Sequence, residues 1–190
     1  MCYIYLMYEV EVKAHLRDRE SVTQKLLSLG CKFSEELHQV DYIFIPIRED
    51  FPPPLTVPVL RVRKQNNKCF FTLKISQSSR QDCIEREFEI SDGDKMIEVL
   101  GFIGYKRVPI VDKKRIKTNF NNIEIVLDDV KDLGEFIEAE KIVKSEDKES
   151  RIKTQEELFD FLRTLGVEKE DHVIDGKYDI MLYNKLSRKI

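Results

Sequence analysis

The sequence has few of the residues that build the most familiar metal and redox sites. Its three histidines, at positions 15, 38 and 172, are too far apart for the close ligand spacing of zinc hydrolases. Its four cysteines are scattered, and no two of them form a Cys-x-x-Cys pair. We therefore expect neither a zinc site nor a disulfide framework, and any bound metal should be a hard cation held by carboxylates.

Long apolar runs and an excess of basic charge are also missing. No stretch approaches the roughly 20 apolar residues that cross a bilayer, and residues 1 to 6 carry no basic segment ahead of an apolar one. The net charge is −3, so the chain lacks the basic excess of a non-specific nucleic-acid binder. We expect a cytoplasmic protein with no membrane or nucleic-acid partner, which must hold any anion through a local cluster of charges.

What the chain does contain is a series of short strand and helix signals. The 190 residues, 42% of them hydrophobic, suffice for one domain with a sizeable core, and no linker or internal repeat is visible. Helices are predicted from Asp18 or Ser21 to Gly30, from Asp92 to Gly101 or Gly104, from Thr154 to Gly166, and over 178–186. Strands are predicted over 8–13, 40–47, 57–64, 69–76, 84–90, 107–118, 123–128 and 135–143. Three prolines at 52–54 predict a loop, and the charged segment 144–153 should be the loosest junction.

The predicted strand over 8–13 separates charge from apolar side chains. Because strand side chains alternate between faces, Glu9, Glu11 and Lys13 share one face while Val10 and Val12 share the other. The same separation recurs in later strands. Their charged faces carry Arg61 and Arg63, Lys74, Glu85 with Glu87 and Glu89, Lys113 with Arg115, Asp128, and Glu138 with Glu140.

Two arrangements explain this alternation. An open antiparallel sheet produces it when one face meets solvent. The grouping of basic residues on some strands and of glutamates on others favours a closed barrel whose charged faces turn inward around a polyanion. Buried charges must be paired, arginine and lysine suit phosphate oxygens, and carboxylates suit a divalent metal that bridges them. The pattern therefore predicts a site for a triphosphate.

The ordered set of motifs resembles the CYTH superfamily over about residues 3–182. That superfamily includes class IV adenylate cyclases, thiamine triphosphatases and inorganic tripolyphosphatases. The resemblance implies an α+β fold, in which an eight-stranded antiparallel β-barrel, the triphosphate tunnel, is surrounded by helices. It also implies a single domain over 1–190, with a barrel core at about 3–143 and a helical part at about 148–190. The motifs that carry it are Glu9-x-Glu11-x-Lys13, Arg61-x-Arg63, Thr72-Leu73-Lys74, Glu85-x-Glu87-x-Glu89, Lys113-Lys114-Arg115, the run from Asp128 to Glu140, and Lys177-Tyr178-Asp179.

The resemblance also implies roles for these residues. It implies that Glu9, Glu11 and Lys13 are catalytic, and that Mg²⁺ or Mn²⁺ is held by Glu9, Glu11, Asp128, Glu138 and Glu140. It implies that the substrate is bound by Arg61, Arg63, Lys74, Glu85, Glu87, Lys113 and Arg115. Lys114 faces away from the site, Lys117 is an open case at its rim, His15 should lie at the surface, and Tyr178 should pack the last helix onto the barrel. One departure is Cys83, which stands near the usual place of an arginine, although Arg80 and Arg86 are close in sequence.

Three functions remain open at this point. The first is a class IV adenylate cyclase-like enzyme that converts ATP to cyclic AMP and pyrophosphate. The second is a triphosphatase that hydrolyses tripolyphosphate, thiamine triphosphate or a nucleoside triphosphate, and the third is a polyphosphate- or nucleotide-binding module without turnover. Selectivity should arise at the barrel mouth, near residues 48–56. The sequence leaves the oligomeric state open, with a homodimer among the alternatives.

Overall fold

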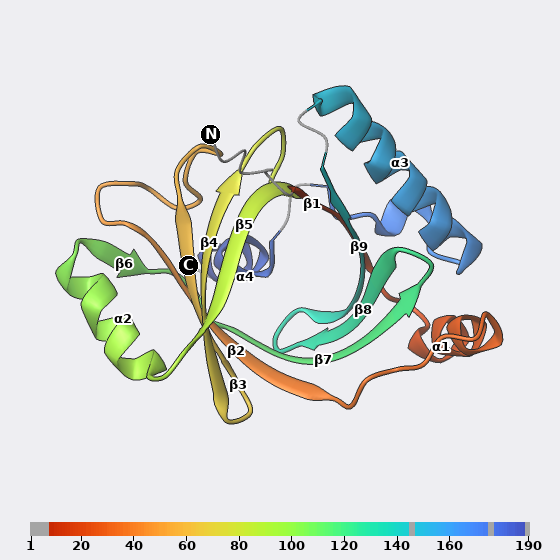
Figure 1. Cartoon of the computed structure of the whole chain (residues 1–190), viewed down its shortest axis with the longest axis horizontal. Coiled ribbons are helices and arrows are strands. Elements are labelled where there is room, and N and C mark those ends of the chain that lie inside the picture. Colours follow the sequence, from red (N-terminus) through yellow and green to blue (C-terminus); the bar gives the residue numbers. More distant parts are fainter. Residues whose placement is uncertain (1–7, 145–146, 175–176, 189–190) are drawn as a thin grey trace, which may run out of the picture.

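The computed structural model describes residues 8–144, 147–174 and 177–188. Within them the elements alternate between antiparallel strands and short helices (Figure 1). The helices are α1 (Arg19–Ser28), α2 (Gly93–Phe102), α3 (Lys148–Thr164) and α4 (Tyr178–Ser187), with a 3₁₀ turn over Lys169–Asp171. The strands are β1 (Tyr8–His15), β2 (Leu37–Pro46), β3 (Val59–Gln65), β4 (Lys68–Ser76), β5 (Asp82–Ile90), β6 (Tyr105–Arg107), β7 (Val111–Phe120), β8 (Ile123–Val130) and β9 (Gly134–Val143).

The strands close into a barrel. Neighbouring strands follow the order β3-β4-β5-β1-β9-β8-β7-β2, and a further pairing between β3 and β2 closes the ring. All of these pairings are antiparallel, which confirms the predicted eight-stranded antiparallel barrel with surrounding helices. In the described part of the chain, β6 is an additional short strand that pairs only with the end of β2.

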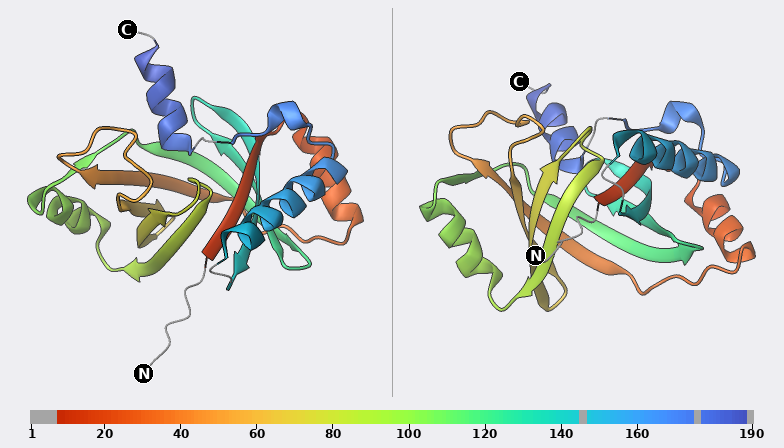
Figure 2. Two further views of the ribbon diagram at one scale, coloured as in Figure 1. Left: turned by 90° about the horizontal axis from the view of Figure 1, so that it is seen from above. Right: turned by 45° about the horizontal axis from the view of Figure 1, so that its top comes forward.

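The apolar faces of the strands point outward, and helices cover much of them, although Phe88 of β5 stays 55% exposed. Val10 and Val12 of β1 are fully buried in one cluster with Leu26 of α1 and with Leu158 and Leu162 of α3. A second cluster packs α2 on the outer face of β3 and β4, and α4 stands at one end of the barrel (Figure 2). The apolar faces of the barrel strands thus pack on the outside of the barrel, and their charged faces line its interior.

Two predicted boundaries were wrong. A single strand was expected over 107–118, but the structure divides it into β6 and β7 around Pro109, which has no backbone N–H to donate to the sheet. The segment 144–153 was expected to be the loosest junction, of which 145–146 lie outside the described residues, and the third helix was expected to begin at Thr154. Helix α3 begins at Lys148 instead, because the Asp147 carboxylate accepts the backbone N–H groups of Glu149 and Ser150.

The remaining local predictions concern helix starts, cysteines and membrane spans. The Asp18 and Asp92 carboxylates cap α1 and α2 as predicted. Cys31, Cys69 and Cys83 are free thiols, while Cys2 lies outside the described residues. In the part of the chain that the structure describes, no helix is both long enough and apolar enough to span a membrane.

Candidate functional site

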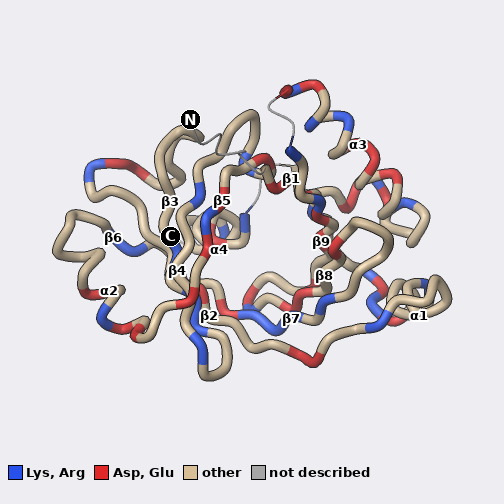
Figure 3. The backbone as a smooth tube through the Cα atoms, in the orientation of Figure 1, with Lys and Arg blue, Asp and Glu red and all other residues tan. Residues whose placement is uncertain are grey.

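The barrel encloses a cavity of about 220 Å³. Figure 3 shows basic and acidic positions interspersed along the strands that surround it. Of the predicted site residues, all except Asp128 line this cavity, and Asp128 lies directly behind the lining with no exposed surface. The structure therefore brings the predicted residues to one place. The predicted site residues that line the cavity are Glu9, Glu11, Lys13, Arg61, Arg63, Lys74, Glu85, Glu87, Lys113, Arg115, Glu138 and Glu140.

Three carboxylates converge on one side of the bore. Glu9 and Glu11 come from β1 and Glu140 from β9, where Glu11 and Glu140 are direct cross-strand partners. One carboxylate oxygen of each residue lies within 4.8 Å of the others. Burial, and then the neighbouring carboxylate of Glu11, raise the pKa of Glu140 to about 7. The pKa of Glu9 is also raised well above its usual value, chiefly by burial.

This acidic cluster has the chemistry of a site for a hard divalent cation. Carboxylates that lie close together repel one another when they are ionised, and this repulsion makes ionisation costly. A divalent cation between them removes that cost. Oxygen ligands alone suit Mg²⁺ or Mn²⁺ and not a soft metal. The three carboxylates therefore fit the metal that the sequence resemblance implies.

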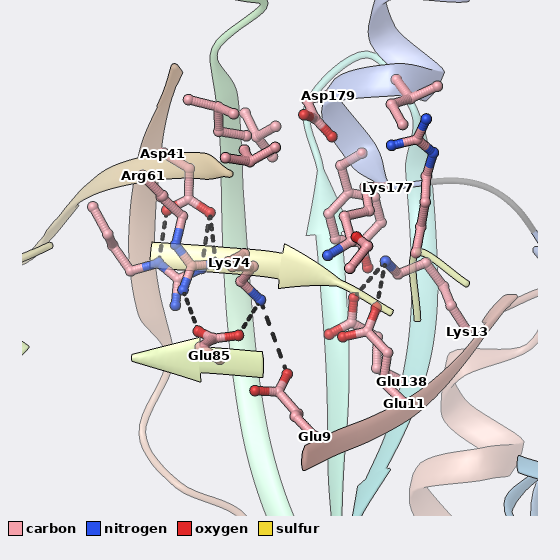
Figure 4. A pocket seen from close by; sticks show the side chains of 18 of the residues that line it. Glu9, Glu11, Lys13, Asp41, Arg61, Lys74, Glu85, Glu138, Lys177 and Asp179 are labelled. Carbon is pink, nitrogen blue, oxygen red and sulfur yellow. Dashed lines mark hydrogen bonds and ion pairs between the residues drawn. The ribbon is translucent and has the colours of Figure 1, made fainter. Parts of the chain in front are cut away.

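The wall next to the acidic cluster carries two cations among glutamates (Figure 4). Arg61 on β3 donates to Glu85 over 3.1 Å and to Glu87 over 2.8 Å. Lys74 on β4 forms an ion pair with Glu85 and lies 3.9 Å from Glu9. Burial alone would lower the pKa values of both cations, but nearby carboxylates outweigh it and raise them, chiefly Asp41 for Arg61 and Glu85 for Lys74. Arg61 and Lys74 are therefore held in their charged forms.

Arg63 is oriented by a residue whose role the sequence did not reveal. The Arg63 guanidinium donates to both carboxylate oxygens of Asp41, over 2.6 and 2.8 Å, and both side chains are buried. The pKa of Asp41 stays far below its usual value because Arg63 overcomes the effect of burial. The alternation of Gln39 and Asp41 along β2 was the available signal, since it places Asp41 on the charged face.

A second network lies at the side of the bore that faces β8 and β9. Arg115 donates to Asp128 over 2.7 Å and to Glu138 over 2.7 Å, and Glu138 also pairs with Lys13 over 3.0 Å. Burial acts in the opposite direction, but nearby cations lower both pKa values, chiefly Lys113 and Arg115 for Asp128, and Lys13 and Arg115 for Glu138. In this geometry the two carboxylates hold cations and lie outside the cluster of Glu9, Glu11 and Glu140. The predicted metal-binding role of Asp128 and Glu138 stays a hypothesis.

Lys113 differs from the other cations of the bore. Burial, and then the neighbouring charge of Arg115, lower the pKa of Lys113 to about 7. Its amine lies 3.5 Å from Asp128, a longer separation than that between Glu138 and Lys13. An amine with this pKa can take up or release a proton near neutral pH, which is the property of a general acid or base.

The residues that were doubtful in sequence are now placed. Lys114 points away from the bore and pairs with Glu36, whereas Lys117 lines the cavity and pairs with Glu124 over 2.7 Å. His15 is exposed and packs against Phe136. Tyr178 packs against Phe136 as expected, with ring centroids 5.0 Å apart, but it also lines the cavity. That second contact was not predicted, because Tyr178 belongs to a helix and has no part in the strand alternation.

One end of the cavity carries an apolar patch, beside the charged side chains of Arg80 and Asp179. The inward row of β3 runs from Arg63 through Arg61 to Val59, and the row of β7 runs from Arg115 through Lys113 to Val111. Ile43 follows Asp41 in the same way on β2, so three strands replace charge by aliphatic side chains. This region is completed by Phe51, Pro53 and Ile180, the first two from the loop where a selectivity region was predicted.

Comparisons with known proteins agree with this geometry. Residues 7–176 match the family model described as the CYTH domain. The chain is 33% identical over 174 residues to the Methanocaldococcus jannaschii protein named "Putative adenylate cyclase MJ0240", with 90% of this chain and 97% of the relative covered. It is 31% identical to the PH1012 protein from Pyrococcus horikoshii OT3, with a TM-score of 0.74 over 92% of this chain and 98% of that one.

A more distant structure shares the fold. It is the protein HpAC1 from Hippeastrum, for which a dominant triphosphatase activity is described, and it is 16% identical to this chain. Its TM-score is 0.59, and the match covers 94% of this chain and 95% of that one. The family match spans most of the chain, from β1 to the segment before α4, and includes every strand that contributes to the cavity. The chain therefore belongs to the CYTH domain family.

Proposed function

We propose that this protein is a metal-dependent enzyme that acts on the phosphate chain of a triphosphate. The observation that carries the proposal is the division of one cavity into a cluster of three carboxylates and a surrounding set of cations. A divalent cation on the carboxylates and several phosphates on the cations would balance charges that are costly to bury alone. Phosphoryl chemistry depends mainly on such charge neutralisation and on positioning, so this arrangement can serve catalysis as well as binding.

Each group in the bore has a part in this proposal. Glu9, Glu11 and Glu140 would hold Mg²⁺ or Mn²⁺, which supplies positive charge to the phosphate oxygens when it is bound. Arginines offer a planar pair of donors to phosphate, and lysines offer a point charge. The phosphates would be bound by Lys13, Arg61, Arg63, Lys74, Lys113 and Arg115, while Asp41, Asp128 and Glu138 keep these cations in place.

The preferred reaction is the conversion of ATP to cyclic AMP and pyrophosphate. In this reaction the ribose 3′-hydroxyl attacks the α-phosphorus, pyrophosphate leaves, and the hydroxyl proton passes to a base. The apolar patch formed by Ile43, Val59 and Val111 supports an organic substrate, since inorganic tripolyphosphate has no group that needs such a surface.

Hydrolysis of a triphosphate is the second candidate function. The same cations and metal would serve it, with water attacking the terminal phosphorus in place of the ribose hydroxyl. The triphosphatase activity described for the Hippeastrum protein supports this alternative, because that protein shares the fold. A binding module without turnover is the least favoured candidate, since a pure anion binder gains nothing from three carboxylates beside the anion.

The products formed from ATP separate these functions. With Mn²⁺ present, we expect the protein to release cyclic AMP and pyrophosphate in equal amounts, and chromatography of the nucleotide products measures this directly. ADP with inorganic phosphate would contradict the cyclase assignment and favour the triphosphatase. Tight binding of ATP without any product would leave only the binding module.

Metal binding should depend on pH in a defined direction. The pKa of Glu140 is raised from 4.5 to about 7 in the folded protein, so at pH 6 a proton occupies part of the acidic cluster and competes with the metal. We therefore expect Mn²⁺ to raise the melting temperature more at pH 8 than at pH 6. Differential scanning fluorimetry over a Mn²⁺ titration at both pH values measures this. An equal shift at both pH values would contradict the assignment of Glu140 as a ligand.

A further inference from the structure

Tyr178 is the one aromatic side chain that the described part of α4 places in the charged bore. It is the first residue of α4, and only 6% of its surface is exposed. Its hydroxyl donates to Asp128 over 3.0 Å, so it shares this carboxylate with Arg115. Every side chain described above as a phosphate contact comes from a barrel strand. The phosphate-binding wall therefore receives part of its structure from outside the barrel.

The ring of Tyr178 also supports two of the proposed phosphate-binding lysines. The Lys13 amine lies 4.1 Å from the ring centroid, and the Lys113 amine lies 5.1 Å from it. Both distances are in the range of a cation–π interaction, which grows stronger when the partners are shielded from water, as all three side chains are here. One ring thus holds two ammonium groups from β1 and β7 beside the same cavity.

The surroundings show what would happen without the ring. The Lys13 amine lies 3.0 Å from Glu138 and 3.6 Å from Glu11. These ion pairs compete with a phosphate for the amine. Lys113 has one longer contact, 3.5 Å to Asp128, and faces the like charge of Arg115. The Tyr178 ring offsets the pull of the carboxylates on Lys13 and the repulsion between Lys113 and Arg115. It attracts the two amines without neutralising their charge.

We propose that Tyr178 is a positioning residue of the triphosphate site, whose ring keeps the amines of Lys13 and Lys113 aimed at the phosphates. This proposal rests on the function proposed above. It makes α4 a part of the site and not only a cover for the end of the barrel. A residue that merely filled space between α4 and Phe136 would affect folding, but it would not affect the affinity of the folded protein for phosphate.

Two variants separate the ring from the hydroxyl. Tyr178→Phe keeps the ring and loses the bond to Asp128, while Tyr178→Leu loses both. Tyr42→Leu is the matched control, because Lys64 lies over the Tyr42 ring at 5.5 Å and this pair packs on the outer side of β2, away from the cavity lining. The measurement is the dissociation constant for tripolyphosphate with Mn²⁺, by calorimetry at a temperature where circular dichroism shows each variant folded.

We expect Tyr178→Leu to weaken tripolyphosphate binding by about tenfold or more, since two cation–π contacts are lost. Tyr178→Phe should bind within about threefold of the wild type, because the ring remains. Tyr42→Leu should bind as the wild type does. Wild-type affinity in folded Tyr178→Leu would overturn the proposal, and so would equally weak binding by Tyr178→Phe and Tyr178→Leu.

A spectroscopic measurement covers the case in which Tyr178→Leu does not fold. The sequence contains no tryptophan, so its near-ultraviolet absorption comes chiefly from tyrosine. Tripolyphosphate bound by the lysines beside the ring should perturb this absorption in the wild type and in Tyr42→Leu, and clearly less in Tyr178→Phe. A perturbation of the same size in Tyr178→Phe as in the wild type would overturn the proposal. If the wild type binds neither tripolyphosphate nor ATP, the proposed function fails as well. If the wild type binds and the Tyr178 variants bind with the same affinity, only the role of Tyr178 is refuted.

Discussion

Replacing Glu140 by glutamine is expected to stabilise the metal-free protein at pH 8 and to abolish its metal-dependent activity. The fold raises the pKa of Glu140 to about 7 through burial and through Glu11 and Glu124. For a carboxyl group with a raised pKa, folding becomes less favourable as pH rises from 4.5 through 7, and the full penalty is present at pH 8. A neutral glutamine avoids that penalty, so the free energy of unfolding should rise by about 1 to 3 kcal/mol.

The same substitution should remove the benefit of the metal. Turnover should fall by at least about 100-fold, and the Mn²⁺-induced rise in melting temperature should largely disappear, because one of three ligands has lost its charge. Urea denaturation, scanning fluorimetry and product assays measure the three effects. Glu135→Gln is the matched control, since Glu135 lies on the same strand, faces outward and has no place in the cavity lining. A Glu140→Gln variant that keeps both its activity and its Mn²⁺ response would rule out the proposed metal cluster.

Asp128→Asn is expected to cost about 3 kcal/mol of unfolding free energy, with little change in the shape of the side chain. Asp128 is fully buried, and its carboxylate accepts from Arg115 and Tyr178 and lies near Lys113. Loss of its charge leaves buried cations without their main partner, which is far more costly than loss of an exposed pair. Urea denaturation measures the difference, and Asp129→Asn, at an exposed position on the same strand, should be nearly neutral.

The Asp128 variant also tests the role assigned by resemblance. If Asp128 holds cations in place, folded Asp128→Asn should bind tripolyphosphate more weakly but should still be stabilised by Mn²⁺. If Asp128 is a metal ligand, the Mn²⁺ response should be lost together with activity. The geometry favours the first outcome, because the Asp128 carboxylate lies outside the cluster formed by Glu9, Glu11 and Glu140.

Some features of the site could be predicted because they depend on local periodicity. Side chains two positions apart in a strand share a face, so Glu9 and Glu11, or Arg61 and Arg63, must point the same way wherever their strand lies. Buried aliphatic partners such as Val10 and Val12 showed which face belonged to the core. The boundary errors at Pro109 and Asp147 have local causes as well, a missing donor and an unrecognised helix cap.

The sequence by itself thus determined which side chains share a strand face, and the motif set pointed to the family and to an inward-facing charged barrel. Only the tertiary structure decided how those charges divide among partners. Strand register sets Glu11 opposite Glu140 and so separates a carboxylate cluster from Glu138 and Asp128, which are bound to cations. Closure of the ring brings Asp41 to Arg63, and the placement of α4 brings Tyr178 to Lys13. These contacts join residues far apart in the chain, so no local period encodes them, whereas the alternation of faces follows from the geometry of a single strand.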